Sequence, residues 1–143
     1  TLHVGAGTFR NLRPEELERG VLHPERYEVP EETVRAIQAC TGRVIAVGTT
    51  VTRTLESACG PDGVPREGPG VTRLFLREGD PFRCIDGLLT NFHLPASSLL
   101  ILVCALAGRE RVLAAYDEAI RHGYRFYSYG DAMLLLPGRS AGR

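Results

Sequence analysis

The sequence of 143 residues contains no lysine, so all 17 of its basic residues are arginine. This absence excludes catalysis by a lysine amine or a lysine Schiff base within the chain. Acidic residues also number 17, which gives a formal net charge of zero. The overall charge therefore gives no indication of binding to nucleic acid or to a membrane, although a local charged patch is compatible with it.

Paired cysteines and long apolar runs are also missing. The four cysteines are spread along the chain, without C-x-x-C spacing and without a neighbouring pair of histidines: Cys40, Cys59, Cys84 and Cys104. This pattern is typical of reduced thiols in a cytoplasmic protein, and it predicts neither a disulfide framework nor a metal site. The longest apolar run, Leu99 to Ala107, is shorter than the ~20 residues that cross a bilayer, and we recognise no signal peptide.

Strand-like and helix-like segments alternate along the chain. This alternation predicts an α/β fold, a layered α/β/α domain with a mixed, largely parallel sheet. We expect residues 1–136 to be a portion of an α/β catalytic domain and residues 137–143 to be a flexible tail. The chain begins at Thr1 rather than at methionine, and we therefore expect it to be part of a larger protein.

Turn and capping residues mark the expected elements. Helices are predicted over 30–41, 50–58, 99–107 and 109–122, with a helical turn from Arg13 and with Ser97 or Ser98 capping a fully buried third helix. Strands are predicted over 43–48, 71–76, 82–86, 133–136 and the segment from Leu88 to Thr90, with short β-like pieces in 2–12. Residues 60–70 contain four glycines and three prolines, and we expect a mobile loop there.

The most informative segment is Leu88-Leu-Thr-Asn-Phe-His-Leu-Pro95. An apolar strand-like approach runs into Thr90, Asn91 and His93, so that an amide, an imidazole and an aromatic face come together at a strand-to-helix junction. His93 is the strongest acid–base candidate because it precedes a proline-restricted turn. A buried, hydrogen-bonded histidine without a catalytic role is the alternative.

A second junction lies at Gly48-Thr-Thr-Val-Thr-Arg53. The free N–H groups at the start of a helix favour an anion, and hydroxyl groups of Thr49 and Thr50 add donors. Arg53, one turn into the helix, can reach the same anion. The alternative is a threonine N-cap beside a tight turn, with Arg53 bound to Glu56.

A third segment, Tyr124-Arg-Phe-Tyr-Ser-Tyr-Gly-Asp131, is rich in aromatic residues. Aromatic faces beside an arginine are suited to a stacked base or nucleoside, and Asp131 can accept a hydrogen bond from a ribose hydroxyl. The alternative is a row of half-buried strand aromatics.

Two segments near the N-terminus give weaker indications. Gly5-Ala-Gly7-Thr8 is too short for the dinucleotide-binding G-x-G-x-x-G pattern, so its glycines more simply permit close backbone approach to a ligand or a strand. The segment His23-Pro-Glu-Arg-Tyr27 groups a base, an acid and a phenol in a turn-like stretch, for which a solvated loop is the alternative.

Five blocks together resemble the C-terminal part of the S-adenosylmethionine:tRNA ribosyltransferase-isomerase family of queuosine biosynthesis. They span nearly the whole chain in family order: His3–Arg10, His23–Tyr27, Val47–Thr50 with Arg53–Ser57, Leu88–Pro95, and Tyr124–Met133. The resemblance implies that the family's N-terminal segments, including an inserted β-barrel-like domain, are not contained in these 143 residues.

The resemblance also implies a reaction. The ribosyl group of S-adenosylmethionine is moved onto 7-aminomethyl-7-deazaguanine in a tRNA anticodon and isomerised, which gives epoxyqueuosine-tRNA and releases adenine and methionine. S-adenosylmethionine is then a co-substrate, and we expect no other cofactor, no metal, no membrane and a monomer.

Removal of a proton beside the sulfonium needs a base, for which His93 is the first candidate and His23 the second. Loss of adenine needs a proton donor, for which Tyr127, Tyr129 or Asp131 are candidates. The candidate catalytic residues are His93, His23, Asp131 and Tyr129. The candidate substrate-binding residues are His3, Gly5, Gly7, Thr8, Glu25, Tyr27, Thr49, Thr50, Arg53, Asn91, Phe92, Arg125, Tyr127, Ser128 and Gly130.

Two other functions are compatible with the sequence. One is a catalytically silent α/β module that binds nucleotide or RNA and needs its missing N-terminal part. The other is an acid–base hydrolase that uses His93 and Asp131, which predicts turnover of simple nucleosides without tRNA.

Overall fold

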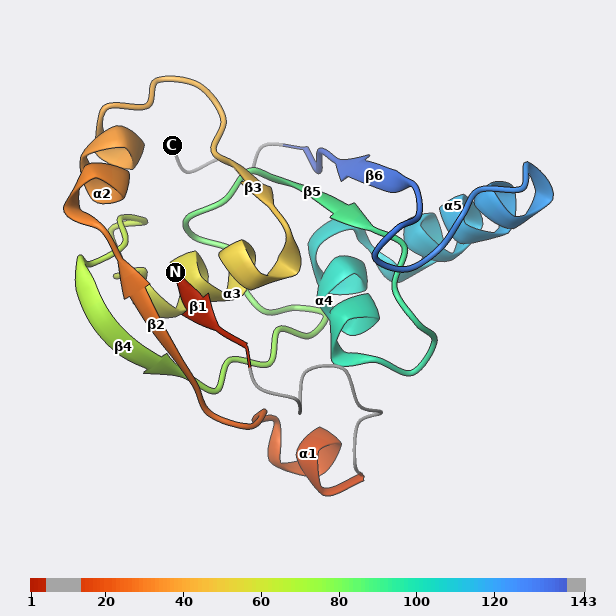
Figure 1. Ribbon diagram of the computed structural model, residues 1–143, viewed down its shortest axis with the longest axis horizontal. Coiled ribbons are helices and arrows are strands. Elements are labelled where there is room, and N and C mark those ends of the chain that lie inside the picture. The colour runs from red at the N-terminus through yellow and green to blue at the C-terminus, as the bar shows by residue number, and fades with distance from the viewer. Residues whose placement is uncertain (5–13, 139–143) are drawn as a thin grey trace.

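A computed structural model of the chain describes residues 1–4 and 14–138 (Figure 1). Strands and helices alternate through most of this part of the chain, as the sequence pattern predicts. The elements in chain order are β1 (Leu2–His3), α1 (Pro14–Arg19), β2 (Glu25–Val29), α2 (Glu31–Gln38), β3 (Ile45–Val47), α3 (Thr49–Ala58), β4 (Gly68–Thr72), β5 (Gly87–Asn91), α4 (Ser98–Ala107), α5 (Arg109–Arg121) and β6 (Ala132–Leu135).

The described strands form two three-stranded sheets. One has the order β1-β2-β4 and is antiparallel throughout, and the other has the order β3-β5-β6. In the second sheet β3 is parallel to β5, whereas β6 is antiparallel to β5. The α/β class and the mixed pairing are confirmed, but the prediction of a largely parallel sheet is wrong for these strands.

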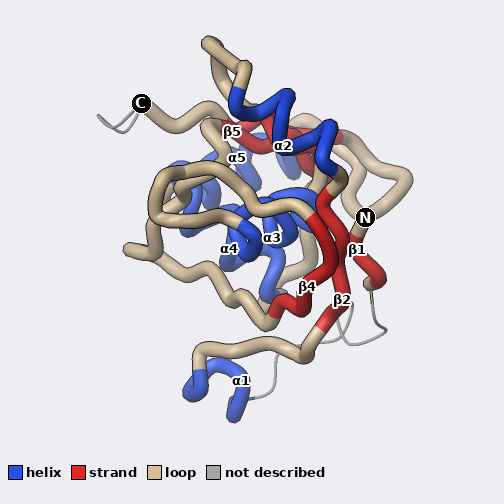
Figure 2. The backbone as a smooth tube through the Cα atoms, turned by 90° about the vertical axis from the view of Figure 1, so that its left-hand side faces the viewer, coloured by secondary structure: helices blue, strands red, loops and turns tan. Residues whose placement is uncertain are grey.

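Helix α3 lies between the two sheets and contacts strands of both. Figure 2 shows β2 and β4 on one side of α3 and β5 on the other. Helices α4 and α5 pack against each other beside the second sheet. Helix α3 is thus central, and it begins directly after β3, where the Gly48 N–H donates to Leu89 O of β5.

The core contains one face of the second sheet and the inner stripes of the helices. Ala46 of β3 and Leu88 of β5 pack with Leu102 and Val103 of α4. The opposite face of the sheet exposes Val47, Leu89 and Leu134, which are direct cross-strand neighbours. Burial of apolar side chains on one face of this sheet therefore supplies its main contact with the helices.

The predicted helices are present with small differences. The Ser97 hydroxyl accepts a hydrogen bond from the Leu100 N–H at 3.2 Å, which confirms the predicted N-cap of α4. The helix is not fully buried as predicted, because its side chains are fully enclosed only along one stripe. On α5 the buried residues are Val112, Tyr116 and Ala119, whereas Leu113 and Ile120 are exposed.

The predicted strands differ more. The segment expected as a turn at 23–27 contains most of β2, which pairs with β4, and β4 itself begins within the predicted loop 60–70. Residues 73–76 and 82–86 form no strand. The carboxylate of Glu56 instead accepts the backbone N–H groups of Arg83, Cys84 and Ile85 at 2.8, 2.9 and 3.0 Å, and this bonding replaces a strand ladder.

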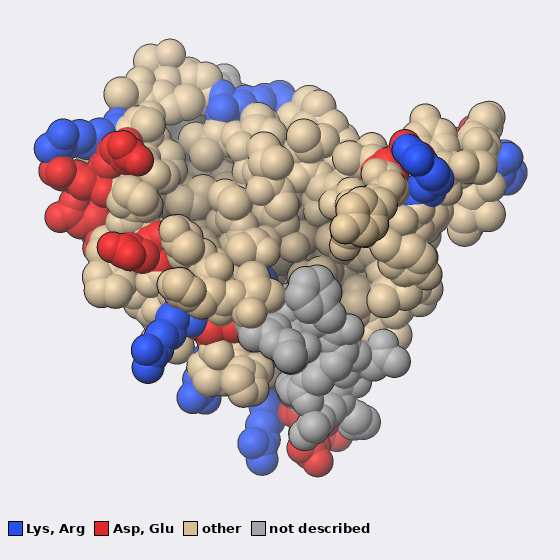
Figure 3. Space-filling model, viewed as in Figure 1, with Lys and Arg blue, Asp and Glu red and all other residues tan. Residues whose placement is uncertain are grey.

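Charged side chains lie mainly around the periphery of the face shown in Figure 3, and the centre of that face is largely uncharged. Within residues 1–4 and 14–138, no helix is long and apolar enough to cross a membrane. The same part of the chain has no cluster of three or more histidine, cysteine or acidic residues arranged to hold a metal ion.

Candidate functional site

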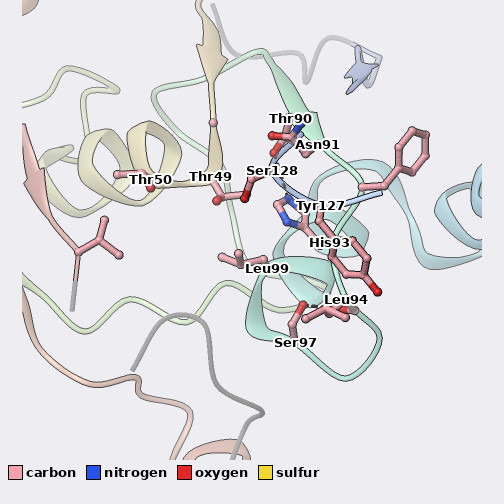
Figure 4. Close-up of a pocket in the computed structure, with 13 residues that line it drawn as sticks. Thr49, Thr50, Thr90, Asn91, His93, Leu94, Ser97, Leu99, Tyr127 and Ser128 are labelled. Atoms are coloured by element: carbon pink, nitrogen blue, oxygen red, sulfur yellow. Dashed lines mark hydrogen bonds between the residues drawn. The ribbon is translucent and has the colours of Figure 1, made fainter. Parts of the chain in front are cut away.

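A pocket of about 310 Å³ opens where the second sheet, α3 and α4 meet (Figure 4). Three separate segments supply most of its wall. The described lining residues are Val4, Gly48, Thr49, Thr50, Thr90, Asn91, Phe92, His93, Leu94, Ser97, Leu99, Tyr127 and Ser128. No arginine, aspartate or glutamate is among them, so hydroxyl groups, one amide and one imidazole provide the polar surface of the described wall.

The first part of the wall is the N-terminus of α3. Gly48 has φ of +92°, a conformation that glycine adopts without strain, and its N–H donates to Leu89 O at 2.8 Å. This bond ties the turn to β5 and brings Thr49 and Thr50 into the pocket. In Figure 4 the side chains of Thr49 and Ser128 point toward each other across the pocket. Because N–H groups in the first turn lack helical partners, this wall is suited to an anionic group.

The second part of the wall is the end of β5, where His93 is held at two points. Its Nε2 lies 3.0 Å from Thr90 Oγ1, and its backbone N–H donates to the Tyr116 hydroxyl at 2.8 Å. Burial lowers the pKa of the His93 imidazole to about 4, because a charged ring is poorly solvated there. His93 is consequently a neutral imidazole near pH 7, with its ring in the wall of the pocket.

Phe92 links the pocket to an aromatic cluster behind it. Its ring centroid lies 5.2 Å from that of Tyr116, 4.9 Å from that of Phe126 and 6.0 Å from that of Tyr124. The contacts with Tyr116 and Tyr124 are edge-on, which stabilises these rings beyond simple burial. The cluster therefore supports Phe92 from behind the pocket.

The third part of the wall is the loop 125–131. The carboxylate of Asp131 accepts the Arg125 N–H at 2.7 Å, and the Asp131 N–H donates to Arg125 O at 2.7 Å. A Cβ at Gly130 would lie 2.3 Å from Arg125 O, so glycine is required there for this close approach. Asp131 thus closes the loop rather than lining the pocket.

Two tyrosines of this loop, Tyr127 and Tyr129, differ in their position relative to the pocket. Tyr127 has φ of +70°, which is strained for a residue with a side chain, and its N–H donates to Phe92 O at 3.2 Å. It lines the pocket with Ser128, whereas Tyr129 is outside the lining and is 96% exposed. Asn91 Nδ2 donates to Asp131 O at 3.5 Å, a long hydrogen bond that connects the loop to β5.

The structure brings together seven of the residues predicted for the site. They come from all three predicted junctions and are Thr49, Thr50, Asn91, Phe92, His93, Tyr127 and Ser128. Arg125, Tyr129, Gly130 and Asp131 belong to the loop that carries part of this wall but are not among the lining residues.

Arg53 and Glu25 lie elsewhere, in a buried ion pair with side chains that are each 3% exposed. Arg53 Nε also donates to Leu74 O at 3.3 Å, and its Nη2 has no hydrogen-bond partner among the described residues. The pair joins α3 to β2. Arg53 is therefore not among the residues that line the pocket, and its alternative partner Glu56 instead binds the backbone of residues 83–85.

The remaining N-terminal candidates are outside the pocket lining. His3 and His23 are exposed, and His23 Nδ1 lies 3.1 Å from Pro24 O of the neighbouring residue. The Tyr27 ring covers Gly70 on the paired strand, where a Cβ would lie 2.4 Å from the ring. Gly5, Gly7 and Thr8 lie outside the described residues.

Six further lining residues are not among the candidate site residues from the sequence: Val4, Gly48, Thr90, Leu94, Ser97 and Leu99. The sequence does indicate Thr90 as a residue near the pocket, since it lies three residues before His93 at the end of a strand. Ser97 was recognised only as a helix cap. For the apolar lining residues, the sequence gives no indication of a role in the pocket apart from their position near the junctions.

Comparisons with known proteins agree with the resemblance. Residues 1–135 match the profile of a family described as "Queuosine biosynthesis protein". A protein of Gloeobacter violaceus named S-adenosylmethionine:tRNA ribosyltransferase-isomerase is 56% identical over 99% of this chain and 41% of its own length. A protein of the same name from Anaeromyxobacter dehalogenans is 58% identical over 95% of this chain and 40% of its own length.

A solved structure shares the fold. The crystal structure of S-adenosylmethionine tRNA ribosyltransferase from Thermotoga maritima has a TM-score of 0.69 and 46% identity, and the match covers 78% of this chain and 40% of that chain. This chain spans about 40% of the length of the curated relatives that it matches. The match to the family profile covers most of the chain, and the chain belongs to the queuosine biosynthesis protein family.

Proposed function

We propose that this chain is the part of a transferase that binds S-adenosylmethionine and moves its ribosyl group onto 7-aminomethyl-7-deazaguanine in a tRNA anticodon. The ribosyl group is isomerised in the same reaction, so that epoxyqueuosine-tRNA forms and adenine and methionine leave. The observation that carries the proposal is the pocket, because residues of four of the five blocks that resemble the family meet in its wall. The names of the relatives supply the reaction class.

The chemistry of the pocket fits S-adenosylmethionine. Its volume of about 310 Å³ is at the lower end of the range for small-molecule sites. The N-terminus of α3, with the hydroxyl groups of Thr49 and Thr50, suits the methionine carboxylate. Leu94 and Leu99 offer apolar surface for adenine, and the Tyr127 ring offers a π-face to the sulfonium cation. The reaction needs no further cofactor in this proposal, and we assign it to the cytoplasm, where free thiols persist.

The loop 125–131 is suited to contact the tRNA. Tyr129 is 96% exposed on a loop whose ends are joined by hydrogen bonds, and the Arg125 side chain is also exposed. Unpaired bases stack on such rings, and a guanidinium can contact the phosphate backbone. In this proposal Tyr129 holds a base near the pocket, rather than protonating adenine inside it.

A second candidate is a portion that binds nucleotide or RNA without turnover. The observation in its favour is that the chain spans about 40% of the length of its curated relatives. Segments from the other part of the relatives would then supply the groups that complete the site.

The test is release of adenine from S-adenosylmethionine with tRNA that carries 7-aminomethyl-7-deazaguanine. The chain is compared with a version extended by the N-terminal segments of the Anaeromyxobacter dehalogenans relative. We expect release by the extended version only with this tRNA, and a loss of about 100-fold or more in His93→Ala, as for the loss of one positioned hydrogen-bond donor. His23→Ala, which changes an exposed histidine outside the pocket lining, is the matched control and should stay near wild type. Failure of both versions to release adenine would refute the ribosyl-transfer proposal, and retained binding of S-adenosylmethionine would then favour the second candidate.

A further inference from the structure

The hydrogen bond between Thr90 and His93 determines which nitrogen of the imidazole carries its proton. Thr90 is 6% exposed and lies in β5, where its backbone is paired with Met133. Its Oγ1 is 3.0 Å from His93 Nε2. No other hydrogen bond of the Thr90 hydroxyl is found within residues 1–4 and 14–138. The imidazole and the hydroxyl are therefore each other's partners in the wall of the pocket.

The two possible directions of this bond leave different groups unpaired. If Nε2–H donates to Thr90, the hydroxyl hydrogen of a largely buried threonine is left without an acceptor, and the Nδ1 lone pair is unpaired as well. If the hydroxyl donates to the Nε2 lone pair, the hydroxyl hydrogen is satisfied, Nδ1 carries the ring proton, and this Nδ1–H is the only group left for a ligand. An unmade hydrogen bond of a buried polar group costs about 1–3 kcal/mol, so the second direction is favoured.

We propose that Thr90 is a positioning residue that donates its hydroxyl hydrogen to His93 Nε2 and thereby keeps the proton of the neutral ring on Nδ1. His93 then presents an N–H donor to the bound substrate. On the basis of the proposed function, the acceptor is a ring nitrogen of the departing adenine, on which electron density builds as its bond to the ribosyl group breaks. His93 stabilises this leaving group by a hydrogen bond and keeps its own proton, and the departing adenine takes its proton from solvent.

Three features of the site support this role. Burial lowers the pKa of His93 to about 4, so the ring is neutral and has two distinct tautomers near pH 7. The second contact, from the His93 N–H to the Tyr116 hydroxyl at 2.8 Å, fixes the backbone at the ring. No described lining residue carries a carboxylate that would compete for the Nδ1 proton. His93 is then not the base that removes a proton beside the sulfonium, in contrast to the expectation from the sequence.

The test is ¹⁵N NMR of the histidine side chains in the chain itself, without substrate. The sequence contains four histidines, and the His93→Gln variant assigns the His93 signals. We expect protonated Nδ1 and unprotonated Nε2 in wild type and in Thr90→Ser, which keeps the hydroxyl. In Thr90→Val, which has a similar shape without the hydroxyl, we expect this preference to be lost. A backbone ¹H–¹⁵N spectrum identifies any variant that fails to fold.

A kinetic measurement in the extended protein links the tautomer to the reaction. Loss of one neutral hydrogen bond predicts that Thr90→Val lowers kcat for adenine release about tenfold, while KM for S-adenosylmethionine and the activity of Thr90→Ser stay near wild type. A wild-type ring protonated at Nε2, or a tautomer that is unchanged in Thr90→Val, would overturn the assignment to Thr90. If the tautomer is as expected but wild type releases no adenine, the proposed function fails and the tautomer assignment stands.

Discussion

The buried pair of Glu25 and Arg53 gives a sharp test of how this fold is held together. Glu25→Gln removes one charge and leaves the Arg53 guanidinium uncompensated at 3% exposure. Loss of one partner of a buried pair costs about 3–5 kcal/mol, because the other charge stays out of water. Arg53 Nη2 already lacks a partner among the described residues, so this side chain has little with which to compensate. Since a domain is stable by about 5–15 kcal/mol, the expected loss is a large fraction of the total.

The measurement is urea unfolding followed by circular dichroism, with three proteins compared with wild type. Glu25→Gln should show the full loss. The double variant Glu25→Leu/Arg53→Met should lie within about 1 kcal/mol of wild type, because both desolvated charges are gone. Glu31→Gln, which breaks the exposed pair with Arg35, is the matched control and should change the free energy of unfolding by less than about 1 kcal/mol. The reasoning is refuted if Glu25→Gln costs less than about 1 kcal/mol, or if the double variant is no more stable than the single one.

Two further predictions concern the site. The folded-state pKa of His93 is about 4 against an ordinary value of 6.5, so the unfolded chain binds this proton first as the pH falls, and stability decreases from pH 6.5 toward pH 4. For a partly solvated ring this contribution to the free energy of unfolding is about 1–2 kcal/mol. Between pH 7 and pH 4.5 the urea midpoint should therefore fall less in His93→Gln than in wild type. An equal fall in both proteins would contradict the lowered pKa of His93. Tyr129→Ala should raise the Kd for an anticodon stem-loop RNA about 5- to 150-fold, as expected for loss of one stacked base. Tyr129→Phe should bind like wild type by fluorescence anisotropy, and equal weakening by Phe and Ala would exclude stacking.

The sequence was most informative where a chain reversal and a polar residue coincide. Thr49 follows a glycine at the end of an apolar run, and His93 follows an apolar strand and precedes a proline. Junctions of this kind lie together at the ends of neighbouring strands. For this reason three separate segments of the sequence each indicate residues of one pocket. Helix boundaries were predictable for a similar reason, since local capping at Ser97 and the turn at Gly108 largely determine them.

Long-range pairing was not predictable from local pattern. Glu25 resembles a solvated acid in sequence, yet β2 turns it inward because its partner Arg53 comes from α3. The segment 82–86 has the composition of a strand, but its backbone is bound by Glu56 rather than by a neighbouring strand.

The pairing of β3 with β5 has a consequence for the order of folding. Val44 N–H donates to the carboxylate of Asp86 at 2.8 Å, across 42 positions of the chain. Contacts of such sequence separation form slowly, because closure of a long loop precedes any gain from pairing. Thr49 and Thr90 face the same pocket only after this step. A ligand of the pocket therefore binds only molecules in which the sheet is complete, and it stabilises the fold as a whole rather than one local segment.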